Sequence, residues 1–361
     1  MDKLLEMTEK YPVTHYWNDS CSLSEIKYAI DRGAVGATTN PVIVKQVLEK
    51  EMDSHRDYIT DLLKNNPNES EDEIAWRVIE KMAAEGAALL EPLFDPSKST
   101  GRISIQTNTK NYNNSARLTA QAVHFAAMAP NIQVKIPVTS EGIKAIEEAT
   151  YRGVSINATV SFSVPQAVAV AEAVERALNR RIIAGLSNDS ISPICTIMIG
   201  RLDDWLKYVA KRDNIPVSPA STPATKSCPD LTILDFAGIS CMKKAYRIYR
   251  ERGYRTRLLA AAYRHIGHWT SFIGGEISMT IPYVNQVAFN AADIEITDHM
   301  EEELHPAGIA ALRKFPDFVK AYDGMDIEEF DSFGPVNKTL EQFAYGYDDL
   351  IRIIRSFMIK Y

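Results

Sequence analysis

The sequence is poor in cysteine and has no basic segment. Its four cysteines lie far apart, without C-x-x-C spacing, which predicts neither a zinc site nor a redox motif. They are Cys21, Cys195, Cys228 and Cys241. The 40 lysines and arginines are spread among 47 acidic residues, for a formal net charge of -7. Nucleic-acid binding needs a basic surface, so we expect no nucleic-acid partner, although local arginines can still bind a small anion.

Long hydrophobic runs are also absent. No segment of the 361 residues approaches the roughly 20 apolar residues needed to cross a bilayer. Residues 1–6 do not form the apolar region of a signal peptide. We therefore expect no membrane association and no export, and the cysteine spacing fits a reducing cytoplasm. The composition, 45% hydrophobic and 24% charged, is that of a globular protein with a large core.

Short segments rich in β-branched residues alternate with amphipathic segments along most of the chain. This alternation predicts βα units around a parallel sheet. Eight units over this length favour an α/β fold closed into a (β/α)8 TIM barrel. The expected strands are residues 14–17, 36–39, 102–106, 132–136, 154–161, 193–199, 255–263 and 277–281. The expected helices, where apolar residues return every three or four positions, include residues 69–93, 113–128, 141–151, 165–180 and 335–358.

The pattern predicts a single barrel domain over residues 1–361 with two additions. One is a helical insertion at about 49–96, and the other is a helical extension at about 306–361 whose last helix lies over the barrel. Residues 214–229 are rich in proline, serine and threonine, which predicts a long loop or an oligomer contact. The partner in such a contact would be a second copy, in a homodimer.

Side chains alternate between a polar and an apolar face in several expected strands. Ser155, Asn157, Thr159 and Ser161 share one face of segment 154–161, and aliphatic residues share the other. By the same alternation, Gln106 lies on the face opposite Ile103 and Ile105, and Lys135 on the face opposite Val134 and Ile136. If helices cover the outside of the barrel, the apolar face packs against them and the polar face lines the interior. A half-exposed antiparallel sheet would show the same alternation, but the intervening helices argue against it.

Lys135 stands out because it lies within the apolar segment Ile132-Gln133-Val134-Lys135-Ile136-Pro137. Burial disfavours an ammonium group and lowers its pKa, which leaves a neutral amine able to attack a carbonyl. Taken alone, this segment equally allows a structural lysine that reaches solvent or pairs with a buried carboxylate.

Other polar residues at strand ends favour the reactive alternative. They are Asp19 after the first strand, Asn40 after the second, Gln106 at the end of the third, and Asn157 and Thr159 in the fifth. Singly, Asn40 before Pro41 is typical of a helix start, and Thr159 suits any strand. Together they supply the proton transfers and hydrogen bonds that Schiff-base chemistry on a ketose needs.

Four ordered segments resemble the signatures of transaldolases. They are Gly36-Ala37-Thr38-Thr39-Asn40-Pro41, Val134-Lys135-Ile136-Pro137, Thr139-Ser140-Glu141-Gly142-Ile143, and Asn157-Ala158-Thr159-Val160-Ser161-Phe162-Ser163 with Gln166-Ala167. The resemblance implies a barrel that transfers a dihydroxyacetone unit from a ketose phosphate, such as fructose 6-phosphate or sedoheptulose 7-phosphate, to an aldose phosphate in the pentose phosphate pathway. No metal or other cofactor is implied.

The resemblance also implies roles for individual residues. Lys135 would form the Schiff base, and Asp19 would act as acid and base. Asn40 and Asn157 would bind the dihydroxyacetone hydroxyls, and Thr159 would hold a catalytic water or a hydroxyl. Arg201, at the end of the sixth strand, and Arg264, at the end of the seventh, are similar to the family's phosphate ligands. Alternatively, Arg264 lies on a helix surface, and Arg201 pairs with Asp203 or Asp204.

Three positions depart from the family pattern. Gln106 stands where most transaldolases have a glutamate, and a glutamine cannot accept a proton. Small fructose-6-phosphate aldolases also have glutamine there, so aldol cleavage is the runner-up function. A non-catalytic sugar-phosphate-binding barrel is disfavoured because Lys135 and Asp19 remain. In the sixth strand, Thr196 aligns with the family's serine without a gap, whereas Ser192 needs one. Ala262 replaces a phosphate-binding serine, which implies a weaker or different anion contact.

Overall fold

Eight parallel strands close into a barrel in the computed structural model, which describes residues 2–220 and 230–359. The strands pair in sequence order, and β1 closes the barrel by pairing with β8. They are β1 (His15–Asn18), β2 (Gly36–Thr38), β3 (Arg102–Gln106), β4 (Ile132–Pro137), β5 (Ile156–Ser161), β6 (Ile194–Met198), β7 (Arg257–Ala261) and β8 (Ser278–Ile281). The predicted (β/α)8 barrel is confirmed, and each strand ends within two residues of its predicted limits.

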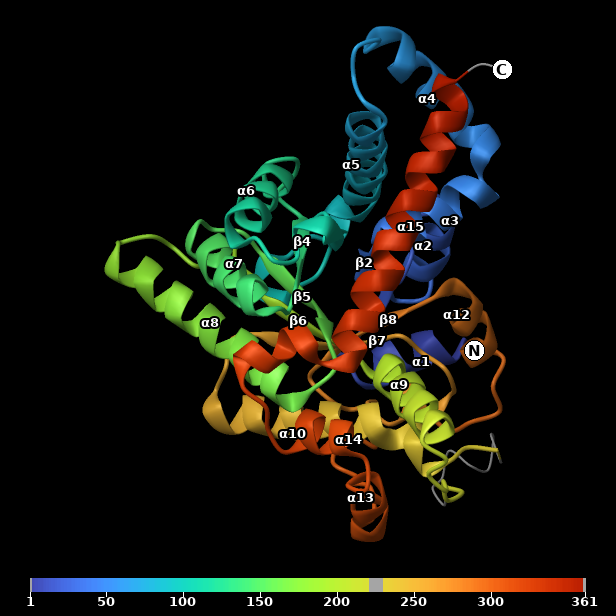
Figure 1. Ribbon diagram of the computed structural model, residues 1–361, viewed down its shortest axis with the longest axis vertical. Coiled ribbons are helices and arrows are strands. Elements are labelled where there is room, and N and C mark those ends of the chain that lie inside the picture. The colour runs from blue at the N-terminus through green and yellow to red at the C-terminus, as the bar shows by residue number, and fades with distance from the viewer. Residues whose placement is uncertain (1, 221–229, 360–361) are drawn as a thin grey trace.

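Helices cover the outside of this barrel (Figure 1). Between the strands lie α2 (Leu23–Ile30), α3 (Pro41–Lys50), α4 (Met52–Asn65), α5 (Glu71–Leu90), α6 (Ser115–Ala126), α7 (Ser140–Tyr151), α8 (Val164–Ile183), α9 (Ile199–Arg212), α10 (Ala237–Arg252) and α11 (Gly267–Thr270). At the two ends of the chain lie α1 (Lys3–Lys10), α12 (Tyr283–Asn290), α13 (Pro306–Leu312), α14 (Pro316–Tyr322) and α15 (Gly334–Met358). No helix in the described ranges is long and apolar enough to cross a membrane.

The insertion expected between the second and third strands contains α4 and α5. Helix α5 begins with a capping box formed by Ser70 and Glu73, and its buried face packs on β3 and α2. It therefore belongs to the outer layer of the barrel. Figure 1 shows α4 and the start of α5 at one end of the molecule, beside the C-terminal end of α15.

Helix α15 crosses the end of the barrel at which the strands finish. It packs on α3, which follows β2, on the turn Thr109–Asn111 after β3, and on α9 after β6. Lys110 pairs with Asp348 of this helix at 2.8 Å, and Gly346 lies against Val42 of α3. The predicted C-terminal helix is therefore present, and Figure 1 shows it passing α9, α3 and α5 in turn.

A β-bulge interrupts the predicted alternation in β5. Ala158 pairs with Cys195 and Ser161 with Ile197, so three steps along β5 match two along β6. Val160 supplies the extra residue with a φ of 55°, a left-handed conformation that β-branched residues rarely adopt. Ser161 is thereby turned to the outer face with Ile197. The prediction that Ser161 shares the inner face with Asn157 and Thr159 is wrong.

Strands β6 and β7 end earlier than the sequence indicated, and this changes where the two arginines lie. Helix α9 begins at Ile199, so Arg201 lies in its first turn and not at the end of a strand. Strand β7 ends at Ala261 because Ala262 has a φ of 67°, which takes the chain out of the extended conformation. Arg264 therefore lies in the loop between β7 and α11.

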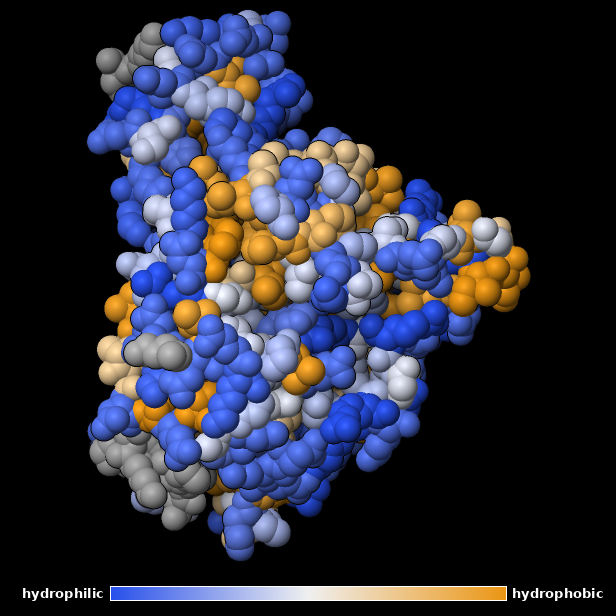
Figure 2. Space-filling model, turned by 180° about the vertical axis from the view of Figure 1, so that it is seen from behind, coloured by the Kyte–Doolittle hydropathy of each residue, from blue (hydrophilic) through white to orange (hydrophobic). Residues whose placement is uncertain are grey.

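An apolar patch lies at the outer end of α8, where Ile182, Ile183 and Leu186 are 58%, 86% and 45% exposed. Helix α8 projects from the side of the molecule, and Figure 2 shows hydrophobic residues at the tip of this projection. Such patches are a feature of contact surfaces. The expected homodimer stays a prediction, and residues 221–229 of the segment expected to form its contact lie outside the described residues.

We predict that Gly36→Ala destabilises the barrel. The new Cβ would lie 2.5 Å from two ring atoms of the fully buried Trp17, which cannot move in the packed interior. Overpacking of this kind costs about 1–3 kcal/mol. Urea unfolding should show this loss, whereas the control Gly324→Ala, where nothing lies within 4 Å, should unfold like the parent. Equal midpoints for both variants would contradict the prediction.

Candidate active site

Lys135 lies in β4 with its neighbours on both sides at the same level of the barrel. Gln106 of β3 and Asn157 of β5 are its register partners, so all three side chains point inward. Lys135 is only 5% exposed. The polar inner face predicted from side-chain parity therefore brings these three residues together.

Asp19 is the acidic partner of Lys135. It follows β1, where its backbone N–H donates to Ile281 of β8. Burial raises the pKa of Asp19, while Lys135, the Thr38 hydroxyl and Arg201 act to lower it. Burial also lowers the pKa of Lys135, which Asp19 in turn raises. Each group thus supports the other's charge in a site that otherwise favours the neutral amine.

Two threonines fix the orientation of the Asp19 carboxylate. Thr38 donates its hydroxyl proton to Asp19 Oδ1 at 2.6 Å. Since a hydroxyl has one proton, Thr280 of β8 must donate to Thr38 Oγ1, also at 2.6 Å. Sequence reasoning missed both roles, although the inward parity of Ser278 and Thr280 in the eighth strand was a signal that could have identified the second.

A chain of hydrogen bonds fixes Asn157. Thr196 of β6 donates to Asn157 Oδ1 at 2.6 Å, and Asn157 Nδ2 donates to Ser104 Oγ at 3.0 Å. Ser104 in turn donates to Gln133 Oε1 at 3.1 Å, so this series of hydrogen bonds joins β6, β5, β3 and β4. Sequence reasoning did not single out Ser104 or Gln133. Because Asn157 has both amide atoms bonded, its orientation is set before any ligand arrives.

Thr196, and not Ser192, is the residue that contacts Asn157. Ser192 precedes β6, and its hydroxyl donates to the carbonyl of Pro96 at 2.7 Å. It also accepts a bond from the buried Arg102, at the beginning of β3. Ser192 is therefore at the opposite end of the barrel from the strand ends.

Gln106 has a free acceptor beside Lys135. Its Nε2 donates to Thr109 Oγ1 at 3.1 Å, whereas its buried Oε1 has no hydrogen-bond partner among the described residues. A substrate hydroxyl or a water can donate to this oxygen, but an amide cannot take the proton away. Thr159, two residues along β5 from Asn157, is buried with its hydroxyl 4.0 Å from Met198 Sδ.

Asn40 lies at the edge of the site and caps a helix. Its Oδ1 accepts the N–H of Ile43 at 3.0 Å, and Pro41 occupies the first position of α3. The helix-start alternative for Asn40 is therefore present in the structure. Since the cap uses only Oδ1, the amide nitrogen can still donate to a ligand.

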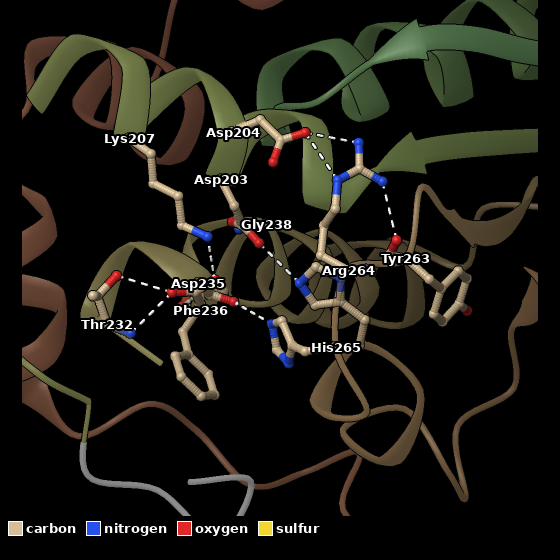
Figure 3. A network of polar contacts seen from close by, with 12 residues as sticks. Asp203, Asp204, Lys207, Thr232, Asp235, Phe236, Gly238, Tyr263, Arg264 and His265 are labelled. Carbon is tan, nitrogen blue, oxygen red and sulfur yellow. Dashed lines mark hydrogen bonds and ion pairs between the residues drawn. The ribbon is translucent and has the colours of Figure 1, made fainter. Parts of the chain in front are cut away.

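Arg201 and Arg264 lie close enough to repel each other. Burial and the neighbouring Arg264 lower the pKa of Arg201 to about 10. Arg201 donates to Thr339 at 3.4 Å and to Gln342, both on α15. Arg264 donates to Asp204 through Nε and Nη2, at 2.9 and 2.7 Å. The alternative pairing of Arg201 with the acids of its own helix is thus not found, since Arg264 pairs with Asp204 (Figure 3).

One group of described residues has the composition of a metal site. The donor atoms of Asp203, His265 and His268 lie within 4.8 Å of one another, and all three side chains are buried. Asp203 and His268 already share a hydrogen bond of 2.8 Å. The group lies directly behind Arg264, to which His268 is bonded through the backbone.

Sequence comparisons relate the chain to one family. The model of the transaldolase/fructose-6-phosphate aldolase family matches residues 16–318. A transaldolase of Nostoc punctiforme is 24% identical over 90% of this chain and 88% of its own length. Transaldolase 2 of Streptomyces avermitilis is 29% identical over 63% of this chain, and the match spans 58% of that relative. A transaldolase of Thermobifida fusca is 30% identical over 48% of this chain and 47% of its own length. The chain therefore belongs to the transaldolase/fructose-6-phosphate aldolase family.

Proposed function

We propose that the chain is a transaldolase that moves a dihydroxyacetone unit from a ketose phosphate to an aldose phosphate through a Schiff base on Lys135. The observation that carries the proposal is a buried lysine with a lowered pKa beside an acid that is itself held in place. The names of the relatives described above support transfer as the reaction.

Each step of the proposed reaction has a residue to carry it. The neutral Lys135 amine attacks the ketose carbonyl, and loss of water gives an iminium ion. Asp19 then takes the proton of the substrate hydroxyl whose carbon separates, so the carbon–carbon bond breaks and the first aldose leaves. The remaining enamine attacks the aldehyde of the acceptor, Asp19 returns the proton, and hydrolysis frees Lys135.

Binding follows from the groups around the lysine. Asn157 Nδ2 and the free amide nitrogen of Asn40 would donate to hydroxyls of the dihydroxyacetone unit, and Thr159 would hold the water of hydrolysis. Thr196 orients Asn157 from behind. Arg201 and Arg264 would bind the phosphate, because a planar guanidinium group can donate two hydrogen bonds to its oxygens at once.

Aldol cleavage with release of free dihydroxyacetone is the second candidate. It is favoured by the free Oε1 of Gln106, which can hold a water but cannot deprotonate it. Transfer and cleavage share every step up to the enamine. They differ in whether an acceptor aldehyde or a proton reaches the enamine first.

We predict that incubation with fructose 6-phosphate and borohydride adds a dihydroxyacetone unit to Lys135. Lys135→Met, similar in shape but without the amine, should lose both the label and turnover. Lys243→Met is the matched control, since Lys243 is a second buried lysine whose pKa burial lowers to about 8. Mass spectrometry of peptides would locate the label, and a label on Lys243 instead of Lys135 would refute the mechanism.

The labelling rate should rise with pH through a midpoint below 10.5, the ordinary pKa of lysine, since burial favours the neutral amine. Asp19→Asn should shift the midpoint to lower pH, because the carboxylate that raises the lysine pKa is removed. Labelling by free dihydroxyacetone with cyanoborohydride measures the midpoint when each rate is divided by the rate of the neutral form of a soluble lysine derivative at the same pH. A midpoint at or above 10.5, or a shift in the other direction, would contradict this picture.

Gln106→Glu should increase transfer relative to cleavage, because a carboxylate beside Lys135 restores a proton acceptor. The ratio is obtained by assaying sugar products and free dihydroxyacetone with and without erythrose 4-phosphate as acceptor. Gln121→Glu is the control, since a glutamate there can still accept the backbone N–H of Asn108 as Gln121 Oε1 does, at 2.7 Å. An unaltered ratio in Gln106→Glu would show that this position does not relay the proton.

A further inference from the structure

A fully buried acid and histidine connect the two elements that carry the arginines. Asp203 belongs to α9, two residues after Arg201, and His268 belongs to α11, four residues after Arg264. Both side chains are 0% exposed, and His268 Nε2 lies 2.8 Å from Asp203 Oδ2. Figure 3 shows Asp203 and Asp204 on the same helix, with Arg264 reaching the second of them.

The hydrogen bonds define where the protons lie. The backbone N–H of Arg264 donates to His268 Nδ1 at 3.1 Å, so this nitrogen carries the lone pair. His268 Nε2 therefore carries the proton and donates it to Asp203, whose other oxygen accepts the N–H of Gly238 at 2.8 Å. Burial lowers the pKa of His268 to about 3, which keeps the ring neutral. Burial also raises the pKa of Asp203 to about 8, while the N–H of Gly238 acts to lower it and so favours the carboxylate. The pair thus bonds to the backbone at Arg264 and at Gly238.

This arrangement does not suit a metal ion, although the residue types do. Coordination by His268 Nε2 would move its proton to Nδ1, where it would face the N–H of Arg264. His265 donates through Nε2 to the carbonyl of Asp235 at 3.0 Å. In this group of three residues, only Nδ1 of His265 has a lone pair without a hydrogen-bond partner among the described residues. One free lone pair is too few for a closed metal site.

The elements joined by this pair are in very close contact. A Cβ on Gly200 would lie 2.1 Å from the carbonyl oxygen of Ala262 and 2.8 Å from Arg264 Cγ. The first turn of α9 therefore rests directly on the loop after β7. Repulsion between the two guanidinium groups opposes this approach, and Arg264 adds to the effect of burial in lowering the pKa of Arg201. The ion pair between Arg264 and Asp204 offsets little of this repulsion, because the two side chains are 38% and 47% exposed to solvent.

We propose that Asp203 and His268 are positioning residues that hold Arg201 and Arg264 together for the phosphate of the sugar substrate. The inference rests on the proposed function, which assigns that phosphate to the arginines. Neither residue touches the substrate. His268 fixes the backbone N–H of Arg264, and Asp203 ties His268 to α9, the helix that carries Arg201, so that two cations stand side by side before the anion arrives.

The test compares phosphate binding with lysine labelling in one set of variants. The two oxygens of Asp203 each accept one hydrogen bond, from His268 Nε2–H and from Gly238 N–H. Asp203→Asn replaces one of these oxygens by an NH2 group, so one of the two donors loses its acceptor. We expect the Kd for inorganic phosphate, measured by calorimetry, to rise about tenfold to hundredfold, since a small misplacement of binding groups can have an effect of this size. We expect the same rise in KM for fructose 6-phosphate. Labelling of Lys135 by free dihydroxyacetone, which has no phosphate, should stay within about twofold of the parent.

Two further variants separate positioning from general damage. Asp235→Asn is the control, because this carboxylate belongs to the same network but bonds to Lys207 and Thr232, and not to the arginines (Figure 3). It should bind phosphate like the parent. Gly200→Ala disturbs the contact between α9 and the loop after β7 without altering a buried charged group. If Asp203→Asn does not fold, Gly200→Ala should show the same loss of phosphate binding with Lys135 labelling retained.

The outcomes are distinct. Parent-like phosphate affinity in Gly200→Ala and in folded Asp203→Asn overturns the inference, as does an equal loss in Asp235→Asn. Stoichiometric zinc in the purified parent, with phosphate binding lost on chelation, also overturns it in favour of a metal site. Absence of lysine labelling in the parent refutes the proposed function instead, because phosphate binding is still measured directly.

Discussion

The mutual influence of Lys135 and Asp19 inside the barrel is the interaction around which the site is organised. A lone ammonium or carboxylate at this depth would pay a large desolvation penalty, and each group offsets part of it for the other. The pair forms only when the barrel closes, because Asp19 follows β1 and Lys135 lies on β4. Thr38 and Thr280, from strands on either side of β1, then orient the acid.

Periodicity was enough to predict the layer that holds the lysine. Because register partners in a parallel barrel share a face, the parity of Gln106, Lys135 and Asn157 already placed them together. The same rule failed for Ser161, since the bulge at Val160 adds a residue that alternation cannot reveal. Local rules therefore hold until the backbone leaves its regular geometry.

Partners distant in the sequence could not be predicted. Arg201 bonds to Thr339 and Gln342, about 140 positions away, and such a contact depends on how α15 packs and not on any local pattern. Thr280 was missed because its role needs Thr38 from a strand on the other side of β1. The resemblance to transaldolases indicated the two arginines, but no local pattern indicated the hydrogen bond between the buried Asp203 and His268.

The contact of Arg201 with α15 also makes the surroundings of this arginine depend on the last helix of the chain. All eight strands precede α15 in the sequence, whereas Arg201 donates to Thr339 and Gln342 within it. A cut in the chain before residue 339 would therefore remove both hydrogen bonds from Arg201 without removing a strand of the barrel.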